Sequence, residues 1–277
     1  FVMYDGGQAL HNDYFTMDAN GTLRTDEPLD YEMDNVFSLS VEVKAMDEHG
    51  GEVSASFDVT YNDVNEAPSG SVTISGTPIV GQQLTASDNL SDDDQGGIGS
   101  KTYRWYRFGD DYVNSNKLVQ NTKYTIGSGV IGEQLVAVVT FGSGDFAETV
   151  VSNPTEPVNG PPTNLQSTAP ITVVENGNLG VVGQIFATDP NGHAITYSLV
   201  AGSGGTHNHF FQLESNGTLS LTSMVDYETN PYLNIRVEAK DEQNATTETS
   251  LSVTVSNVDE EPTGEVTISG IPEVGET

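Results

Sequence analysis

The stretch His11–Glu32 reads HNDYFTMDANGTLRTDEPLDYE, and it recurs as HNHFFQLESNGTLSLTSMVDYE at His207–Glu228. The match continues past the stretch, because Asp47 and Asp241 occupy equivalent positions in the two copies. The separation between these aspartates is nearly twice the ~100 residues of one β-sandwich. We therefore expect the repeating unit to be a pair of different domains.

The local patterns predict β-structure throughout. Leu39, Val41 and Val43 alternate with polar residues, which is the period-two pattern of a half-buried strand. Asn20-Gly21 and Asn216-Gly217 predict two-residue hairpin turns, because this dipeptide tolerates the positive φ of a type I′ turn. No stretch keeps a helical period, so we expect no long helix.

Composition restricts the classes of partner. The 277 residues carry 9 Lys and Arg against 40 Asp and Glu, a formal net charge of −31. Such a chain repels nucleic acid and anionic membrane surfaces, and no apolar run approaches the ~20 residues of a membrane span. The absence of cysteine suits a secreted bacterial protein in which a cation replaces the disulfide. The sequence begins and ends in mid-pattern, so we expect a piece of a longer protein.

The repeated segment resembles a cadherin repeat over its whole length. The resemblance is carried by Val174-Glu175-Asn176, Ala187-Thr188-Asp189-Pro190-Asn191, Tyr197-Ser198-Leu199, Asn216-Gly217-Thr218-Leu219, Asp226-Tyr227-Glu228, Ala239-Lys240-Asp241-Glu242 and Asp259-Glu260-Glu261-Pro262. The segment between the copies, with SVTISGTPIVGQQLTAS at 71–87 and YRWYRFG at 103–109, is similar to the immunoglobulin-like repeats that alternate with cadherin repeats in giant bacterial adhesins.

These resemblances imply an all-β fold of tandem Greek-key β-sandwiches in an elongated array. We expect an N-terminally truncated cadherin-like domain at 1–68 and an immunoglobulin-like domain at 69–158. A second cadherin-like domain at 159–262 and the start of another immunoglobulin-like domain at 263–277 follow. Trp105, the single tryptophan, is expected in the core of the immunoglobulin-like domain.

Paired carboxylates predict calcium. Asp226 and Glu228 are two residues apart, and the pair recurs as Asp30 and Glu32. On an extended segment these side chains share one face, where two carboxylates are costly unless a cation or proton lies between them. Calcium takes ~6–8 oxygen ligands. Recurrence favours calcium over a solvated acidic loop and over a glycosidase-like pair, so we expect no enzyme and assign no catalytic residue.

The resemblance places calcium at the ends of the repeats. The lower site of the first copy would use Asp30, Glu32, Asp63, Asn65 and Glu66. The lower site of the second would use Glu175, Asp226, Glu228, Asp259 and Glu260, and its upper side offers Asp189, Asn191 and Asp241. The acidic loop that begins at Asp88 could complete the first site or be a solvated turn. Gly160 stands where the other linkers have Glu66 and Glu260, so we expect that linker to bind calcium poorly.

The function expected from this reasoning is a calcium-stiffened extender and cell-adhesion module of a bacterial surface or secreted adhesin. Its partners would be neighbouring repeats of the same chain, with a cell-surface polysaccharide or another adhesin copy as further candidates. The alternative is a carbohydrate-binding module, which an exposed aromatic strip would favour. Strand alternation places Tyr103 and Trp105 on one face and Tyr106 on the other, and core packing of the first pair is the preferred interpretation.

Overall fold

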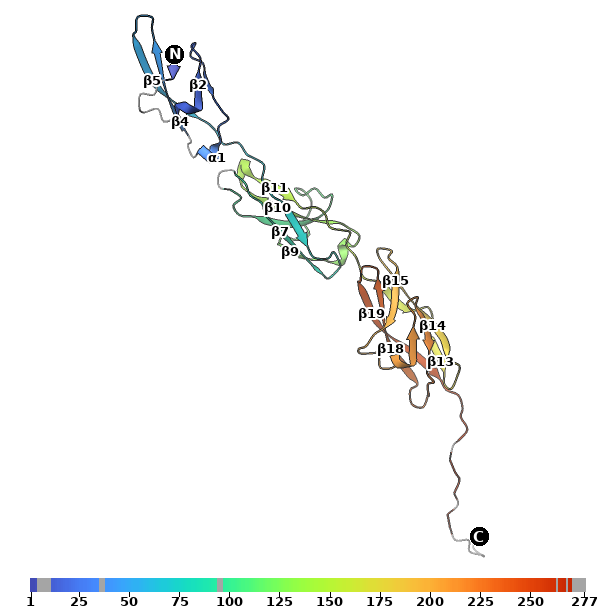
Figure 1. The fold of residues 1–277 in the computed structure, drawn as a ribbon. Helices are drawn as coiled ribbons and strands as arrows, with labels where there is room; N and C mark the ends of the chain where they lie inside the picture. The colour runs from blue at the N-terminus through green and yellow to red at the C-terminus, as the bar shows by residue number, and fades with distance from the viewer. Residues whose placement is uncertain (4–10, 35–37, 94–96, 263, 268, 271–277) are drawn as a thin grey trace, which may run out of the picture. The chain divides into compact units, whose positions relative to one another are not determined.

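The computed structural model describes residues 1–3, 11–34, 38–93, 97–262, 264–267, 269 and 270. Nineteen β-strands and one four-residue helix, α1 (Tyr31–Asp34), lie in this part of the chain, which confirms the predicted all-β fold of tandem β-sandwiches (Figure 1). The short 3-10 helices are η1 (Asn12–Tyr14), η2 (Ser128–Val130), η3 (Gly144–Phe146) and η4 (Asn208–Phe210). Most of the predicted domain start at 263–277 lies outside the described residues.

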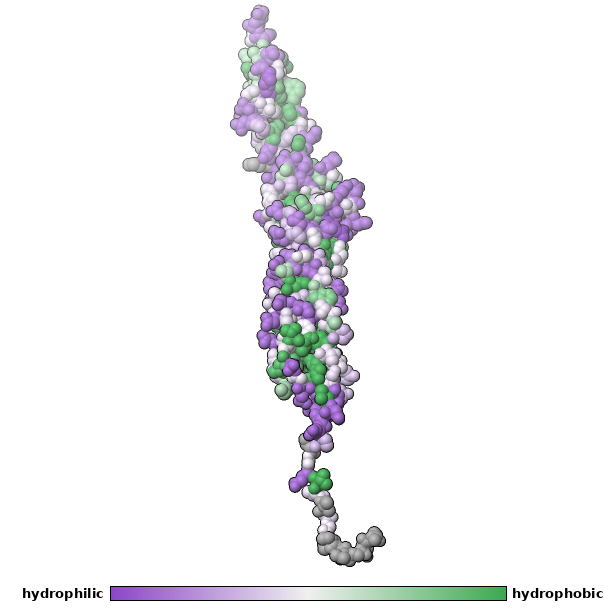
Figure 2. Space-filling model, turned by 90° about the vertical axis from the view of Figure 1, so that its right-hand side faces the viewer, coloured by the Kyte–Doolittle hydropathy of each residue, from purple (hydrophilic) through white to green (hydrophobic). Residues whose placement is uncertain are grey.

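The chain divides into two compact units. The first comprises Phe1–Pro78, Gln82–Ile126 and Glu133–Pro157, and the second comprises Ile79–Gly81, Gly127–Gly132 and Val158–Thr277. In the described part of both units, no helix is long and apolar enough to cross a membrane. Hydrophilic residues predominate on the face drawn in Figure 2, with apolar residues scattered among them.

The second repeat copy forms a sandwich of two four-stranded sheets. One sheet has the strand order β13 (Ile171–Val174), β19 (Thr246–Ser256), β18 (Tyr232–Asp241), β15 (Ile195–Leu199). The other has the order β12 (Thr163–Ser167), β14 (Gly180–Thr188), β17 (Thr218–Leu221), β16 (Phe211–Leu213). β13 pairs with β19 in parallel, and the other strand pairs of this sandwich are antiparallel.

Strand alternation builds the core of this sandwich. Leu233, Ile235 and Val237 on β18 are fully buried, and they pack in one cluster with Ile185 and Leu219 of the facing sheet. Successive side chains of a strand point to opposite faces, so the polar residues between them face outward.

The first repeat copy has the same pattern in smaller sheets. One sheet has the strand order β1 (Val2–Met3), β4 (Ser38–Met46), β5 (Glu52–Thr60). The other pairs β2 (Phe15–Met17) with β3 (Leu23–Thr25). Leu39, Val41 and Val43 of β4 are buried together with Phe15, as their alternation predicts.

The prediction of two-residue type I′ turns is wrong. Gly21 and Gly217 have positive φ values of 87° and 88°, whereas Asn20 and Asn216 are not among the residues with positive φ. The Asn side chains instead accept hydrogen bonds from the backbone N–H two residues later, at 3.1 Å in the first copy and 3.0 Å in the second. This local bond holds the asparagine in a normal conformation and leaves only the glycine left-handed.

The segment between the copies contains two three-stranded sheets. One sheet has the strand order β6 (Val72–Ser75), β7 (Gln83–Asp88), β9 (Lys123–Thr125). The other has the order β11 (Glu148–Val151), β10 (Leu135–Phe141), β8 (Thr102–Arg107). Trp105 is fully buried, and its Nε1 donates to the Asn121 carbonyl at 3.0 Å, which confirms the predicted core tryptophan. Tyr106, on the opposite face of β8, is also buried, in a separate cluster with Val136 and Val138.

A core truncation tests this packing. Leu233→Ala removes a fully buried side chain, and we expect the free energy of unfolding of the second unit to fall by ~2–5 kcal/mol. The matched control is Leu179→Ala, because Leu179 is half exposed. Denaturant unfolding curves give the free energy of unfolding of both variants. An equal loss in the two would contradict the assigned core.

Candidate metal centre

Three groups of metal-ligand side chains occur among the described residues. In each, carboxylate or imidazole ligand atoms lie within 4.8 Å of one another. The groups are Glu32, Asp63 and Glu66 (the first acidic group), Glu175, Glu228 and Glu260 (the second acidic group), and Asp189, His193 and Asp241 (the mixed group). Every member except His193 was predicted from the sequence.

The first acidic group joins α1 to the segment that follows β5. Glu32 lies on α1, and Asp63 and Glu66 come after the end of β5. Glu32 Oε1 and Asp63 Oδ1 are buried and have no hydrogen-bond partner. Burial raises the pKa of Glu32, and the charges of Asp63 and Glu66 raise it further, against a backbone hydrogen bond that lowers it. The group thus gathers negative charge at a cost that a cation would relieve.

More acids line the space beside this group. Asp30, Glu32, Glu66 and Asp93 line one pocket of about 770 Å³ within the first unit. Asp93 belongs to the acidic loop that follows β7; the next residue of the loop, Asp94, is outside the described residues.

Asn65, another predicted ligand, uses its side chain otherwise. It donates to Glu148 Oε1 at 3.0 Å, while Glu148 Oε2 is buried without a partner. Glu148 was not predicted from the sequence, because a single acid on a strand forms no recognisable pattern.

Asp88 is held by other residues. Its carboxylate accepts hydrogen bonds from Lys101 Nζ and from the Tyr103 hydroxyl. Although burial opposes ionisation, these bonds lower the pKa of Asp88, and the bond to Asp88 raises the pKa of Tyr103 to about 12. Asp88 therefore has a cationic partner of its own and lies in none of the three groups.

The second acidic group is organised by a buried glutamate. Glu175 is 1% exposed, and it directly follows β13. Its Oε2 accepts from the Tyr227 N–H at 2.8 Å, and its Oε1 accepts from the Val258 N–H at 2.5 Å. One carboxylate thus ties β13 to the turn at Tyr227 and to the tail after β19.

Two asparagine amides complete this group. Asn257 Nδ2 donates to Glu228 Oε1, and Asn176 Nδ2 donates to Glu260 Oε1, both at 3.0 Å. Asn257 stands where the first copy has Asp63, and here it contacts an acid of the group as a donor. The carboxylates of Glu175, Glu228 and Glu260 accept hydrogen bonds from backbone N–H groups and side-chain amides, which carry no positive charge to neutralise them.

The geometry assumed for the Asp-x-Glu pair is wrong. The chain turns at 227–229, and Asp226 Oδ1 accepts from the Glu228 and Thr229 N–H groups at 3.0 and 3.4 Å. The Thr229 hydroxyl also donates to Asp226, and this bond is the main cause of a lowered Asp226 pKa. Asp226 thus stabilises the turn that presents Glu228, because short polar side chains readily bond to nearby backbone. Asp259 is exposed and outside the group.

The mixed group lies at the other end of the second copy. Asp189 Oδ1 accepts from the Asn191 and His193 N–H groups, and Asp241 Oδ1 accepts from the Gln243 and Ala245 N–H groups. Asn159, which is fully buried, donates its amide to Asp241 Oδ2 at 2.6 Å. Asp189 Oδ2, His193 Nδ1 and Asn159 Oδ1 remain buried without a hydrogen-bond partner.

The position of Gly160 is explained by packing. Its N–H donates to Asn191 Oδ1 at 2.8 Å. A Cβ atom there would lie 2.7 Å from Ile131 Cδ1 and 2.8 Å from Pro190 Cγ. A glutamate like those of the other linkers would therefore require Ile131 and Pro190 to shift.

The donor chemistry separates the groups. Both acidic groups offer only oxygen ligands, which calcium prefers. The first group has buried carboxylate oxygens without a hydrogen-bond partner, and the second has a buried glutamate. Both features fit a calcium ion. The mixed group adds an imidazole, which suits transition metals better than calcium. Asn159 and His193 were not among the ligands predicted from the sequence, because neither belongs to the repeated acidic pattern.

The raised pKa of Glu228 predicts a pH dependence. A backbone hydrogen bond lowers this pKa, but desolvation and the charges of Glu175 and Glu260 outweigh it and hold the pKa above its ordinary 4.5. The folded chain then binds more protons than the unfolded chain between these values, so calcium-free stability rises as pH falls through the raised pKa.

We therefore expect Glu228→Gln to raise the melting temperature in chelator at pH ~7 and to lose this advantage as the pH falls to 4.5, the ordinary glutamate pKa. Glu214→Gln, an exposed change outside the three groups, is the control. A constant difference between Glu228→Gln and wild type across this range would contradict the assigned charge repulsion.

The chain is similar to known cadherins. Residues 169–256 match the family described as Cadherin domain, a stretch that includes the second acidic group's Glu175 and Glu228 and the whole mixed group. No curated protein matches the chain.

Among the solved structures that match are extracellular cadherin domains. Protocadherin Gamma B2 extracellular cadherin domains 3–6 is 21% identical, with 88% of this chain and 62% of that chain covered and a TM-score of 0.37. Mouse Protocadherin-24 EC1–3 is 18% identical, with coverages of 88% and 86% and a TM-score of 0.34. Drosophila N-cadherin EC1–4 is 16% identical, with coverages of 89% and 66% and a TM-score of 0.31. The chain spans about three fifths of the first of these structures. Residues 169–256 therefore form a cadherin-like β-sandwich.

Proposed function

We propose that this chain is a calcium-binding repeat segment of a bacterial surface or secreted adhesin, and that it acts as a calcium-stiffened extender and cell-adhesion module. The observation that carries the proposal is the second acidic group. A glutamate that is 1% exposed stands beside two further carboxylates, and none of the three has a basic partner among the salt bridges of the described residues.

Bound calcium would supply positive charge to both acidic groups. Glu175, Glu228 and Glu260 would hold it in the second copy, and Glu32, Asp63 and Glu66 would hold it in the first, with Asp30 and Asp93 close by. Extracellular modules bind calcium with dissociation constants of ~10⁻⁴–10⁻³ M, so the proposed response falls at millimolar calcium.

The mechanical consequence follows from which segments these side chains join. Glu260 lies in the tail after β19, whereas Glu175 and Glu228 belong to the sandwich. Asp63 and Glu66 likewise lie in the segment after β5, and Glu32 lies on α1. A cation that neutralises each group would fasten these connecting segments to their sandwich, and without it like charges repel.

The linker at 158–160 would be held differently. Asn159 and Gly160 are bonded to Asp241 and Asn191 by protein hydrogen bonds, and a side chain at Gly160 would displace Ile131 and Pro190. We therefore propose that this linker depends less on calcium than the segments at 63–66 and 258–260.

Bacterial origin and extracellular location are part of the proposal. The net charge of −31 and the absence of cysteine support a secreted bacterial protein that is stabilised by cations in place of disulfides. The cadherin-like sandwich supports adhesion through contacts between repeats, and no reaction is assigned to the carboxylates.

Small-angle X-ray scattering tests the extender function. We expect millimolar calcium to increase the maximum dimension of wild-type protein relative to chelator, while circular dichroism stays β-rich. The double variant Glu32→Gln/Glu66→Gln should lose part of this change, because it removes two of the three charges of the first acidic group. Glu214→Gln should behave as wild type. Identical scattering with calcium and with chelator would contradict the proposal.

A further inference from the structure

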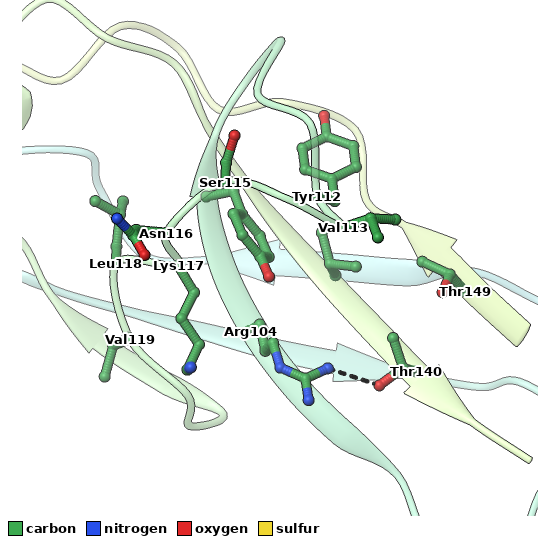
Figure 3. A pocket seen from close by; sticks show the side chains of 12 residues that line it. Arg104, Tyr112, Val113, Ser115, Asn116, Lys117, Leu118, Val119, Thr140 and Thr149 are labelled. Atoms are coloured by element: carbon green, nitrogen blue, oxygen red, sulfur yellow. Dashed lines mark hydrogen bonds between the residues drawn. The ribbon is translucent and has the colours of Figure 1, made fainter. Parts of the chain in front are cut away.

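A pocket of about 580 Å³ lies in the first unit, on the face of the β8–β10–β11 sheet that carries Tyr106. Figure 3 shows Arg104 from β8 and Thr140 from β10 on its strand side, and Tyr112, Ser115 and Lys117 on the loop that follows β8. Trp105 is not among the lining residues, since its side chain points into the core.

The charge of this pocket is opposite to that of the chain. Arg104 and Lys117 line it, and none of its twelve lining residues is acidic, although the chain has 40 Asp and Glu. Neither cation forms a salt bridge among the described residues, whereas Lys101 and Arg236 each pair with a carboxylate. Two cations without an acidic partner therefore make this pocket locally positive on an acidic chain.

Arg104 is oriented for such an anion. One guanidinium nitrogen, Nη1, donates to Thr140 Oγ1 at 2.9 Å, as the dashed line in Figure 3 shows. This bond fixes one end of the guanidinium and leaves its other N–H groups available. A planar guanidinium binds a carboxylate through two parallel hydrogen bonds, a geometry that lysine lacks.

The remaining lining suits a sugar. The rings of Tyr106 and Tyr112 lie 5.4 Å apart between centroids and are tilted by 55°, and Tyr112 is partly exposed. Aromatic rings offer apolar faces that carry a polar hydroxyl at one end. Ser115, Thr140 and Thr149 add hydroxyl groups, which donate to and accept from the hydroxyls of a saccharide.

We propose that this pocket binds a saccharide that carries a single carboxylate, of the uronic acid class. Arg104 and Lys117 bind the carboxylate, and Tyr112 packs against the sugar ring. A single charge is specified because the net charge of −31 repels densely charged polyanions, whereas a short ligand meets mainly the local cations within a Debye length of ~8 Å. The pocket is independent of the acidic groups and of the proposed calcium function.

Isothermal titration calorimetry on the whole chain tests this proposal. The probes are an oligosaccharide with one glucuronate, the same oligosaccharide with the carboxylate reduced to an alcohol, and free acetate. We expect the glucuronate probe to bind at millimolar concentration or below, and each of the other two to bind at least about tenfold more weakly, because each loses charge-assisted hydrogen bonds or ring contacts.

Variants locate the binding. Lys117→Gln changes an exposed loop residue and should weaken glucuronate binding about tenfold, and Tyr112→Ala should weaken it for both saccharides. Lys123→Gln, a cation outside the pocket, is the matched control. Thermal melts check that each variant is folded.

Calcium separates this pocket from the acidic groups. The titrations are repeated in chelator, where binding should persist. If binding disappears in chelator and its affinity is unchanged by Lys117→Gln, the sugar binds through calcium at the acidic groups. That result would overturn the proposal. Failure of all probes to bind, or equal binding of the glucuronate and reduced oligosaccharides, would also overturn it.

Discussion

The structure depends on carboxylates that are brought together without enough positive charge. Glu175 is buried because its two oxygens accept backbone N–H groups from the turn at Tyr227 and from the tail at Val258. This arrangement closes one end of the sandwich, but it also sets Glu228 and Glu260 beside a buried negative charge. Such a group is costly unless a cation neutralises it, so the fold at this end and the proposed cation binding are two aspects of one constraint.

Much of the fold could be predicted because period-two alternation is a direct consequence of strand geometry. Leu233, Ile235 and Val237 lie in the core for that reason, and Trp105 does as well. The turns could not be predicted in detail, because the choice between a two-residue turn and a longer one depends on which backbone N–H the asparagine side chain accepts. The Asn-Gly dipeptide alone does not indicate which of these side-chain or backbone hydrogen bonds forms.

The sequence indicated which residues could form the candidate metal centre better than it indicated their contacts. Repetition and resemblance pointed to Glu32, Asp63 and Glu66 and to Glu175, Glu228 and Glu260, which the structure brings together. Asp88 was selected by its place before an acidic loop, but Lys101 and Tyr103 engage it, and pairing across strands was not predictable from that loop. Asn159 reaches Asp241 only through a tertiary contact, whereas His193 lies four residues after Asp189 and contacts it locally.

The most direct test of the account is the number of calcium ions bound, measured by equilibrium dialysis on wild type and on Glu175→Gln with millimolar calcium. We expect wild type to bind calcium and Glu175→Gln to bind fewer ions, since the substitution removes the buried charge of the second acidic group. Glu214→Gln should bind as many ions as wild type. No bound calcium in wild type, or the same number in wild type and Glu175→Gln, would contradict the account.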